Sequence, residues 1–531
     1  MKLQFADIHV HPSLKPFNNK DYPSGEGKTI WDRFKKREED LKKLNLKIRG
    51  DLEELAKSSQ ANLDACVETN LVCPFFALYP TERQWFDPQP KGLYKPIFWL
   101  LISPRKYHHL GAAASGFPTG KVKKIMCRIK NGIGIDYFNK ELLPLMEYTI
   151  DQTNITSQNH PEYSFKIATS YDEFKKYTQP NSKTICGILT IEGGSALGNY
   201  LHHDTFKKEF GDLETDEKEL LEESFKENIT KIKSWREGKY TPFFISFCHH
   251  FNSLLAGHAR SLSPIFFKFF DQKPEMNEGF NELGKNVLEL LLRKDNGRRI
   301  LIDTKHMSIK SRMYYHNLVK DRRKEGDRIP IIQSHAAING WESFNEAIKY
   351  SEDKKLNKNA YFSRWRINMN DEEILDIYDS DGIVGIVFHE GRMPGGLVKD
   401  RTKKYRKWFN KLKEKENMSA RQQRKFNKVI ENLKLIYNEL LWSNIFHIVR
   451  LIHKNRKSNG EPANGWNIIS IGSDYDGLVD PFNVYFSVKD FQTLFQDMMN
   501  YIKRQNGPIY YSENGKRQEF KKEEIEELMF G

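Results

Sequence analysis

Two histidines separated by one residue end the first apolar run of the chain. His9 and His11 lie at the end of Leu3–Val10 and just beyond it, in the order Asp7-Ile8-His9-Val10-His11. Successive side chains of a strand point to opposite faces, so Asp7, His9 and His11 share one face. Two imidazoles on one face can chelate a Zn²⁺ ion, with Asp7 available to orient them. The alternative is two surface histidines on an edge strand, and the pair alone does not decide between the two.

Glu192 ends a second apolar run, Ile185–Ile191, and is followed by Gly193 and Gly194. A carboxylate in this position is costly to bury unless something pairs with it. Its two oxygens could bridge two metal ions, one oxygen to each. The alternative is an ordinary acid at a strand end that caps the next helix.

His306 and His335 follow two further apolar runs, Ile300–Asp303 and Ile329–Gln333. One such histidine is more often a core or loop residue than a ligand. Two of them on adjacent strands of a barrel would meet at the same mouth. That arrangement predicts a second metal position.

A histidine pair and an aspartate follow two other runs. His249 and His250 come after Phe243–Phe247, and strand alternation lets only one of them face the site. Asp474 lies in the segment GSDYDG, which follows Ile468–Ile471. A carboxylate there could take a proton from a metal-activated water and return it to a leaving amine. A plain Gly/Asp turn is the alternative.

The elements that must position these side chains are short apolar runs separated by longer, charged, amphipathic segments. An eighth strand is expected near Ala61–Val72, and helices are expected at Asn281–Arg293 and Asp371–Tyr378. Alternating strands and helices predict an α/β fold, a (β/α)8 TIM barrel with large insertions, as one hydrolase domain over residues 1–531. Barrel enzymes carry their chemistry at the carboxyl ends of the strands, where these polar residues stand. Seven strands are predicted from the apolar runs at Leu3–Val10, Ile185–Ile191, Phe243–Phe247, Ile300–Asp303, Ile329–Gln333, Gly382–Phe388 and Ile468–Ile471.

Three segments do not fit the repeating pattern of the barrel. Residues 76–135 are rich in Pro, Gly, Trp and Tyr and show no clear period. Residues 399–432 are strongly charged and helical in character. We expect both to be insertions, and we expect residues 516–529 to form a charged closing helix.

The composition is that of a globular protein, with 84 Lys and Arg, 71 Asp and Glu, and a net charge of +13. The excess is small beside the total charge and is concentrated locally, so we expect solvated helix faces and no nucleic-acid partner. The first residues have the pattern of a strand rather than of a signal peptide, so we expect none, and no apolar run reaches the roughly 20 residues needed to span a bilayer. The five cysteines are scattered. Together these features predict a cytoplasmic location.

The order of the segments HVH, IEGG, SFCHHFN, DTKHMS, QSHAA, RINMNDEE and IGSDYDG resembles that of the renal or membrane dipeptidase family (peptidase family M19). This family lies within the metal-dependent amidohydrolases. The resemblance covers most of the chain, from Asp7 to Gly477. It implies a binuclear zinc dipeptidase that hydrolyses the amide bond of a dipeptide or a similar small amide.

The resemblance also implies roles for particular residues. His9 and His11 would hold one metal, His306 and His335 the other, and Glu192 would bridge them with a hydroxide between. In the same comparison, Asp474 moves the proton, His249 contacts the substrate or the oxyanion, and Arg366 binds the substrate carboxylate, with Arg364 as the alternative. We also allow for a homodimer.

The chain departs from the family pattern in ways that keep other functions open. The family usually has Asp where this chain has His11, which removes one negative charge and could change the metal preference. Arg366 lies in a motif with an extra residue, and the two insertions could reshape the mouth of the barrel. One alternative is therefore that the chain is a different amidohydrolase, a lactonase or a deaminase, instead of a dipeptidase. A non-catalytic barrel that acts as a binding protein is another.

Overall fold

The structure is a computed structural model, and the part of the chain that it describes falls into two compact units. The first unit comprises Met1–Tyr315 with Ser473–Val479, and the second comprises His316–Gly472 with Asp480–Gly531. The described residues are 3–19, 29–33, 59–90, 95–96, 106–262, 266–351, 353–413, 415, 417–477, 480–504 and 507–530.

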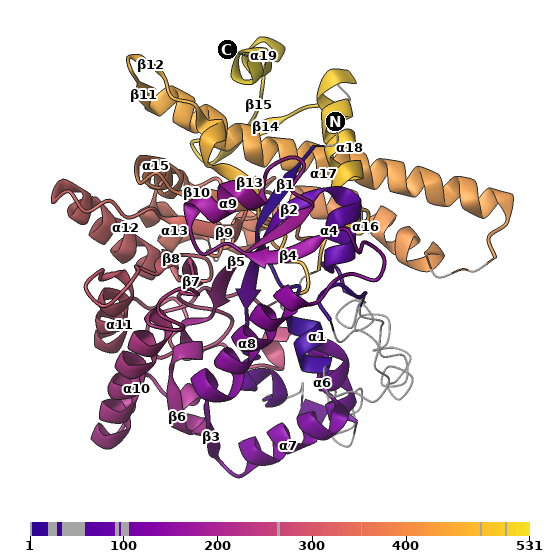
Figure 1. The fold of residues 1–531 in the computed structure, drawn as a ribbon. Helices are drawn as coiled ribbons and strands as arrows, with labels where there is room; N and C mark the ends of the chain where they lie inside the picture. The colour runs from indigo at the N-terminus through magenta and orange to yellow at the C-terminus, as the bar shows by residue number, and fades with distance from the viewer. Residues whose placement is uncertain are drawn as a thin grey trace. The chain divides into compact units, whose positions relative to one another are not determined.

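The predicted (β/α)8 barrel with insertions is confirmed: the chain forms a closed, parallel, eight-stranded barrel. Within the first unit the parallel pairs run in the order β1–β2–β5–β7–β8, and within the second in the order β9–β10–β13. Figure 1 shows β1, β2 and β5 side by side. The strands are β1 (Phe5–Val10), β2 (Leu71–Leu78), β5 (Thr184–Glu192), β7 (Phe244–Ser246), β8 (Leu301–Asp303), β9 (Ile332–Ala336), β10 (Ile383–Ile386) and β13 (Ile469–Ile471).

The strand expected near Ala61–Val72 is a helix followed by a strand. Helix α4 (Leu63–Thr69) ends at Asn70, which adopts the left-handed conformation typical of a helix end. Strand β2 begins directly afterwards and continues to Leu78. Residues 66–69 have the β-branched and apolar character of a strand, but α4 buries Leu63 and Cys66 as a helix would. Strand β2 thus includes residues 76–78, the first residues of the expected insertion.

The segment between β2 and residue 135 contains two helices with a small apolar core of their own. Helix α6 (Tyr107–Ser115) packs against α7 (Thr119–Lys130), and the segment ends in β3 (Ile133–Asp136). Residues 91–94 and 97–105 of this expected insertion lie outside the described residues. The shared core consists of Phe86, Ala112, Phe117, Val122 and Ile125.

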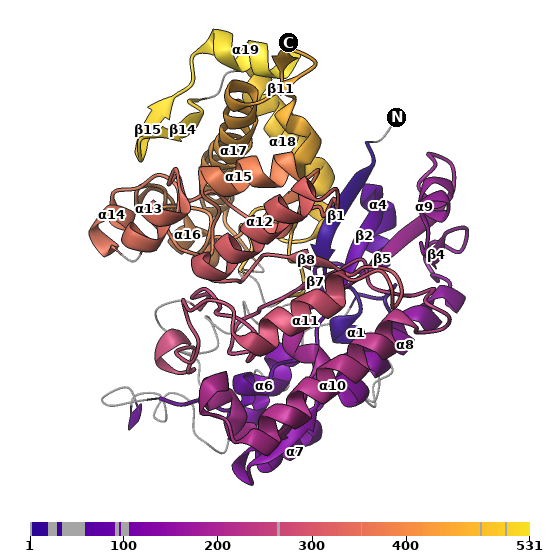
Figure 2. The same cartoon turned by 90° about the vertical axis from the view of Figure 1, so that its left-hand side faces the viewer.

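The remaining helices of the first unit pack along the strands. Figure 2 shows α10 and α11 side by side, and α11 is held at its start by the side chain of Asn281, which accepts from the backbone of Gly284. The elements of this unit not yet named are α1 (Leu14–Asn19), α8 (Leu143–Asp151), β4 (Ser164–Ile167), α9 (Tyr171–Tyr177), β6 (Asn199–His202), α10 (Thr215–Lys233) and α11 (Glu282–Leu292).

The second unit is dominated by helices. Its longest, α17 (Ala420–Asn455), begins with a capping box between Ser419 and Gln422. Helix α15 (Asp371–Asp379) begins with a second capping box, between Asn370 and Glu373. The other elements are α12 (Ile309–Lys324, which contains the boundary between the units), α13 (Phe344–Tyr350), α14 (Lys354–Lys358), α16 (Gly396–Leu412), β11 (Lys457–Ser458), β12 (Glu461–Pro462) and α18 (Phe491–Arg504).

The C-terminal segment differs from the single helix expected over residues 516–529. Strands β14 (Tyr510–Glu513) and β15 (Lys516–Glu519) form an antiparallel hairpin, and helix α19 spans Lys522–Phe530. Asn514 and Gly515 have φ values of 51° and 67°. An Asn-Gly pair with positive φ at both positions favours a tight hairpin turn, and this outweighs the helical character of the charged residues around it.

Two global features complete the fold. Among the described residues, no helix combines the length and the apolar character needed to cross a membrane. Four of the five cysteine thiols are buried, and Cys127 is exposed on α7.

Candidate functional site

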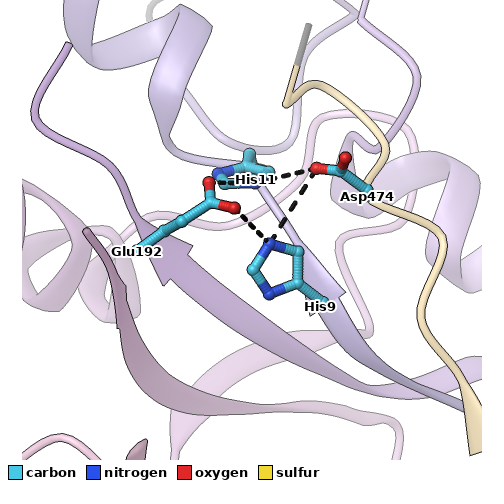
Figure 3. Close-up of side chains that lie close together, drawn as sticks. All are labelled: His9, His11, Glu192 and Asp474. Carbon is cyan, nitrogen blue, oxygen red and sulfur yellow. Dashed lines mark hydrogen bonds and ion pairs between the residues drawn. The ribbon is translucent and has the colours of Figure 1, made fainter. Parts of the chain in front are cut away.

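Four side chains predicted to do chemistry meet in the first unit. His9 and His11 come from the end of β1, and Glu192 is the last residue of β5. Nε2 of His9 lies 3.1 Å from Oε1 of Glu192, and Nε2 of His11 lies 3.3 Å from its Oε2. Figure 3 shows these three residues together with Asp474. We call these four residues the buried cluster, because each side chain is buried.

Asp474 reaches the buried cluster because its loop runs beside the end of β1. Its backbone N–H donates to the carbonyl of His9 (2.9 Å), and the N–H of His11 donates to the carbonyl of Tyr475 (3.0 Å). Oδ1 of Asp474 then lies 3.4 Å from Nε2 of His11. A Cβ on Gly477 would overlap this carboxylate and lie 2.8 Å from the His11 ring, so the loop can pass this close only with glycine there.

Glu192 is the centre of the site, and its two oxygens face different groups. Oε2 faces His11, whereas Oε1 faces His9, His249 at 3.3 Å and His306 at 3.8 Å. Burial alone would raise the pKa of this carboxyl, but the imidazoles of His249, His9 and His11 hold it well below its ordinary value. The carboxylate is therefore ionised inside the protein and compensated by rings at the ends of two strands, β1 and β7.

The donor set fits a divalent metal ion. The buried cluster offers imidazole nitrogens and carboxylate oxygens, the ligand types of zinc, and these atoms lie within 4.8 Å of one another. Nε2 of His11 is buried and has no hydrogen-bond partner among the described residues, although carboxylate oxygens face it. Buried polar atoms nearly always form hydrogen bonds. A buried imidazole nitrogen that forms none, and that points toward other possible ligand atoms, is therefore suited to bind a metal ion. Glu192, His249 and His306 form a second group of the same kind.

Two residues of the site adopt left-handed backbone conformations. Asp474 has φ of 58° and His306 has φ of 68°. For residues other than glycine this conformation costs of order 1 kcal/mol or more and persists only where the surroundings fix it. Such positions cluster at functional sites, and here both belong to the set predicted from the sequence.

Asp7, which was expected to orient the imidazoles, accepts hydrogen bonds from the backbone of the first strand and of the loop that carries Asp474. Its Oδ1 accepts from the backbone N–H of His9 and from that of Ser473, each at 3.1 Å. Burial raises the pKa of Asp7 to about 6, despite these hydrogen bonds. The same carboxyl thus fixes the end of β1 and the start of the loop that carries Asp474.

Glu82 is a residue of the site that the sequence did not reveal. Its Oε2 lies 2.8 Å from Nδ1 of His249, and its Oε1 accepts from the backbone N–H of Phe251 at 3.2 Å. Burial lowers the pKa of His249, but the carboxylates of Glu192 and Glu82 outweigh this and raise it to about 10. Glu82 follows β2 by four residues, so correct placement of that strand would have put it at a strand end.

The two histidines after β7, which ends at Ser246, face different groups. His249 lies against Glu192 and Glu82, whereas Nδ1 of His250 forms a 2.7 Å hydrogen bond with the Ser261 hydroxyl. Of the two histidines, His249 is therefore the one that belongs to the site geometry.

Lys15 and Asp476 anchor the loop of Asp474 on its other side. Nζ of Lys15 donates to Oδ1 of Asp476 at 2.6 Å, and both side chains are buried. The Asp476 carboxylate also accepts from the backbone N–H groups of Gln60 and Ala61, each at 3.0 Å. A buried carboxylate with this many donors holds its loop rigidly.

Two of the predicted residues lie in the second unit. His335 is part of β9, where its Nδ1 is 2.8 Å from the Ser334 hydroxyl. Nη2 of Arg366 donates to the carbonyl of Ile348 at 2.7 Å. Arg364 donates to the carbonyl of Gly340 at 2.7 Å. Their roles toward a metal or a substrate remain predictions.

Comparison with known proteins finds no family model and no curated protein that matches the chain. Among solved structures, the probable dipeptidase PvdM from Pseudomonas aeruginosa is 16% identical, with a TM-score of 0.42 over 89% of this chain and 86% of that one. A metallopeptidase from Rhodobacter sphaeroides bound to a phosphinate mimic of the dipeptide L-Ala-D-Ala is 12% identical, with a TM-score of 0.42 over 94% and 93%.

A further similar structure is the dipeptidase AC of metallopeptidase family M19, at 12% identity and a TM-score of 0.40 over 94% and 93% of the two chains. The first of these proteins is described as a probable dipeptidase and the other two as metallopeptidases. The identities are 16% or lower and the TM-scores lie below 0.5. No activity is therefore transferred from them, and the function is inferred from the residues of this chain.

Proposed function

We propose that this chain is a metal-dependent hydrolase of dipeptides or similar small amides, with two divalent ions, Zn²⁺ being the best match to the donors. The observation that carries the proposal is the arrangement around Glu192. One carboxylate oxygen faces His11, and the other faces His9, His249 and His306. A carboxylate near both the His9–His11 pair and His306, at the carboxyl end of a barrel strand, suits a bridge between two ions.

His9 and His11 would hold the first ion and His306 and His335 the second, with Glu192 between them. When bound, the two ions would polarise the amide carbonyl and make a water molecule more acidic. His335 lies in the second unit, apart from the other proposed ligands, so its place in this set rests on the sequence pattern alone.

Asp474 is suited to move the proton. Its carboxylate lies in the buried cluster, and its backbone is fixed by the carbonyl of His9. It can accept a proton from the attacking water and return it to the leaving amine, so that the amine departs neutral.

His249 is suited to bind the developing oxyanion. The hydrogen bond to Glu82 fixes the orientation of its ring. An imidazole N–H directed at the carbonyl oxygen stabilises the negative charge that appears there. Arg366 remains the candidate for the substrate carboxylate.

A lactonase or deaminase is the second candidate, favoured by His11 at a position where dipeptidases of the M19 family usually have Asp. The replacement removes one negative charge from the metal site and would change the acidity of the attacking water. A barrel that binds without catalysis is the third candidate, and it predicts no stoichiometric metal.

The test begins with the metal content of the untreated protein, followed by chelation and reloading with Zn²⁺. We expect about two ions per chain. The reloaded protein should hydrolyse some members of a dipeptide panel, and the chelated protein should hydrolyse none. Hydrolysis of lactones or amino-purines alone would support the second candidate, and absence of metal would support the third.

The matched pair Asp474→Asn and Asp212→Asn tests the proton-transfer role. Both changes remove one carboxylate charge, but Asp212 is exposed and belongs to none of the site motifs. We expect Asp474→Asn to lower kcat by about 10² to 10⁴-fold, the range for loss of a general acid–base group. Asp212→Asn should leave kcat unchanged. Full activity of Asp474→Asn would contradict the assignment.

A further inference from the structure

The net positive charge of the chain is concentrated in one helical hairpin. Residues 396–434 comprise α16 and the first part of α17, and we call them the basic hairpin. They contain 14 Lys and Arg against four Asp and Glu, which gives a net charge of +10. The whole chain has a net charge of +13. The rest of the molecule is therefore close to neutral.

The two helices of the basic hairpin pack together through an apolar seam. Figure 1 shows α16 and α17 lying side by side. The rings of Phe409 and Phe426 are 5.5 Å apart, and Leu412 and Val429 are buried. Because the apolar side chains face inward, the basic side chains are left on the outside of the hairpin.

A few of these cations are used to attach the basic hairpin to its own unit. Arg401 forms an ion pair with Glu439 at 2.5 Å, and Lys434 forms one with Asp497 at 2.8 Å. Arg406 lies 3.1 Å from Glu390. These pairs lie toward the base of the hairpin, where α16 starts and where α17 enters the rest of the unit.

A larger group is exposed and forms no ion pair with any carboxylate in the part of the chain that the structure describes. Their charges are uncompensated, and like charges held this close repel one another. The group consists of Lys403, Lys404, Lys407, Lys411, Arg421, Arg424 and Lys428.

Lys425 lies among several of these cations. Its Nζ lies 2.9 Å from the centroid of the Trp408 ring. Partial desolvation and the positive charges of Lys411, Arg421 and Lys404 lower the pKa of Lys425. The cations of both helices thus share one electrostatic field, and a polyanion laid across them would relieve the repulsion.

We propose that the basic hairpin binds the phosphate backbone of nucleic acid. The linear array of exposed cations fits a polymer with regularly spaced negative charges, and the half-exposed rings of Tyr405 and Trp408 lie among them. Among the described residues, one exposed large apolar side chain, Leu435, adjoins the basic hairpin, and none lies among its exposed cations. A membrane-binding helix would present such side chains, so charge complementarity favours nucleic acid over a lipid surface.

This proposal reverses the expectation from the sequence and does not depend on the hydrolase function. The sequence showed the size of the charge excess, which is modest for a chain of 531 residues. The structure adds that most of the exposed excess lies on two adjacent helices. It also identifies which cations have a carboxylate partner.

The test is a titration of the full chain with a fluorescein-labelled, mixed-sequence DNA duplex and with its single strand, followed by anisotropy. We expect micromolar binding at low salt, and a loss on the order of 100-fold between about 50 and 200 mM salt, as for four phosphate contacts. The variant K403Q/K404Q/K407Q should bind about tenfold more weakly and show a salt slope lower by about 2 to 3.

A matched control is available on α7. The variant K123Q/K124Q/K130Q also removes three exposed lysines. We expect it to bind nucleic acid like the unchanged chain. Circular dichroism of both variants shows whether they keep their helices.

Three results would overturn the proposal. The first is no binding of either DNA at low salt, and the second is equal weakening by the two triple variants. The third is binding to vesicles that contain phosphatidylserine which is as strong as binding to DNA, because this would identify a lipid surface as the partner.

Discussion

The buried cluster and the basic hairpin both concentrate charge, but they treat it in opposite ways. In the buried cluster the Glu192 carboxylate is surrounded by imidazoles, and nearby Lys15 is paired with Asp476. In the basic hairpin the neighbours of a cation such as Lys425 are other cations. Burial makes an uncompensated charge expensive, whereas water screens it at the surface. Removing one charge should therefore have large effects on the first region and small effects on the stability of the second.

The largest effect is expected from Glu192→Gln, which removes the one carboxylate that all the surrounding rings share. We expect loss of bound metal and a fall in hydrolysis of about 10³-fold or more, because both the metal position and the charge on it change. Metal analysis and kcat/KM measure the two effects. The exposed carboxylate Glu162 supplies the control, and Glu162→Gln should change neither. Retention of two ions and of full activity in Glu192→Gln would contradict the bridging role.

The next effect concerns stability, and it compares a buried ion pair with an exposed one. Lys15→Met removes the partner of the buried Asp476 and should lower the free energy of unfolding by about 3 kcal/mol. Lys175→Met removes the partner of Asp172, where both side chains are exposed, and should cost about 0.5 kcal/mol or less. Urea denaturation measures both. If both variants lost the same free energy of unfolding, burial would not determine how much an ion pair contributes to stability.

A smaller effect on catalysis is expected from Glu82→Gln, since Glu82 acts through His249. The ring should lose its fixed orientation while the metal ligands stay in place. We expect kcat to fall about 10- to 100-fold, with unchanged metal content and little change in KM. Loss of metal in this variant would make His249 a ligand rather than a group that binds the substrate.

The strand-end residues of the site could be predicted because parallel strands place their carboxyl ends at one mouth. Glu192 and His306 stood out because each follows an obvious apolar run. Glu82 could not be found in this way, because the helical and strand preferences of residues 61–72 are mixed and the tertiary packing makes α4 helical. The ion pairs of the cations also could not be predicted from the sequence. Arg401 on α16 pairs with Glu439 on α17, 38 residues away in the chain.

The smallest effect is expected from Lys407→Gln in the basic hairpin, and it has the opposite sign to the others. Lys403, Lys404 and Lys411 lie three or four residues from it on α16, and the fourth such neighbour, Asn410, is uncharged, so every charge in these positions is a like charge. Lys and Gln have similar helix propensities, so the change mainly removes repulsion. We expect a gain of about 0.5 kcal/mol in the free energy of unfolding, and we expect high salt to abolish it.

The control for this gain is Lys226→Gln on α10. The residues three and four positions before Lys226 are Glu223 and Glu222, so the same substitution removes attraction there. It should lower the stability by a similar few tenths of a kcal/mol at low salt. Thermal unfolding of both variants at low and high salt measures the difference. If Lys407→Gln were as destabilising as Lys226→Gln, the basic hairpin would hold its charges in compensated pairs, and the contrast with the buried cluster would disappear.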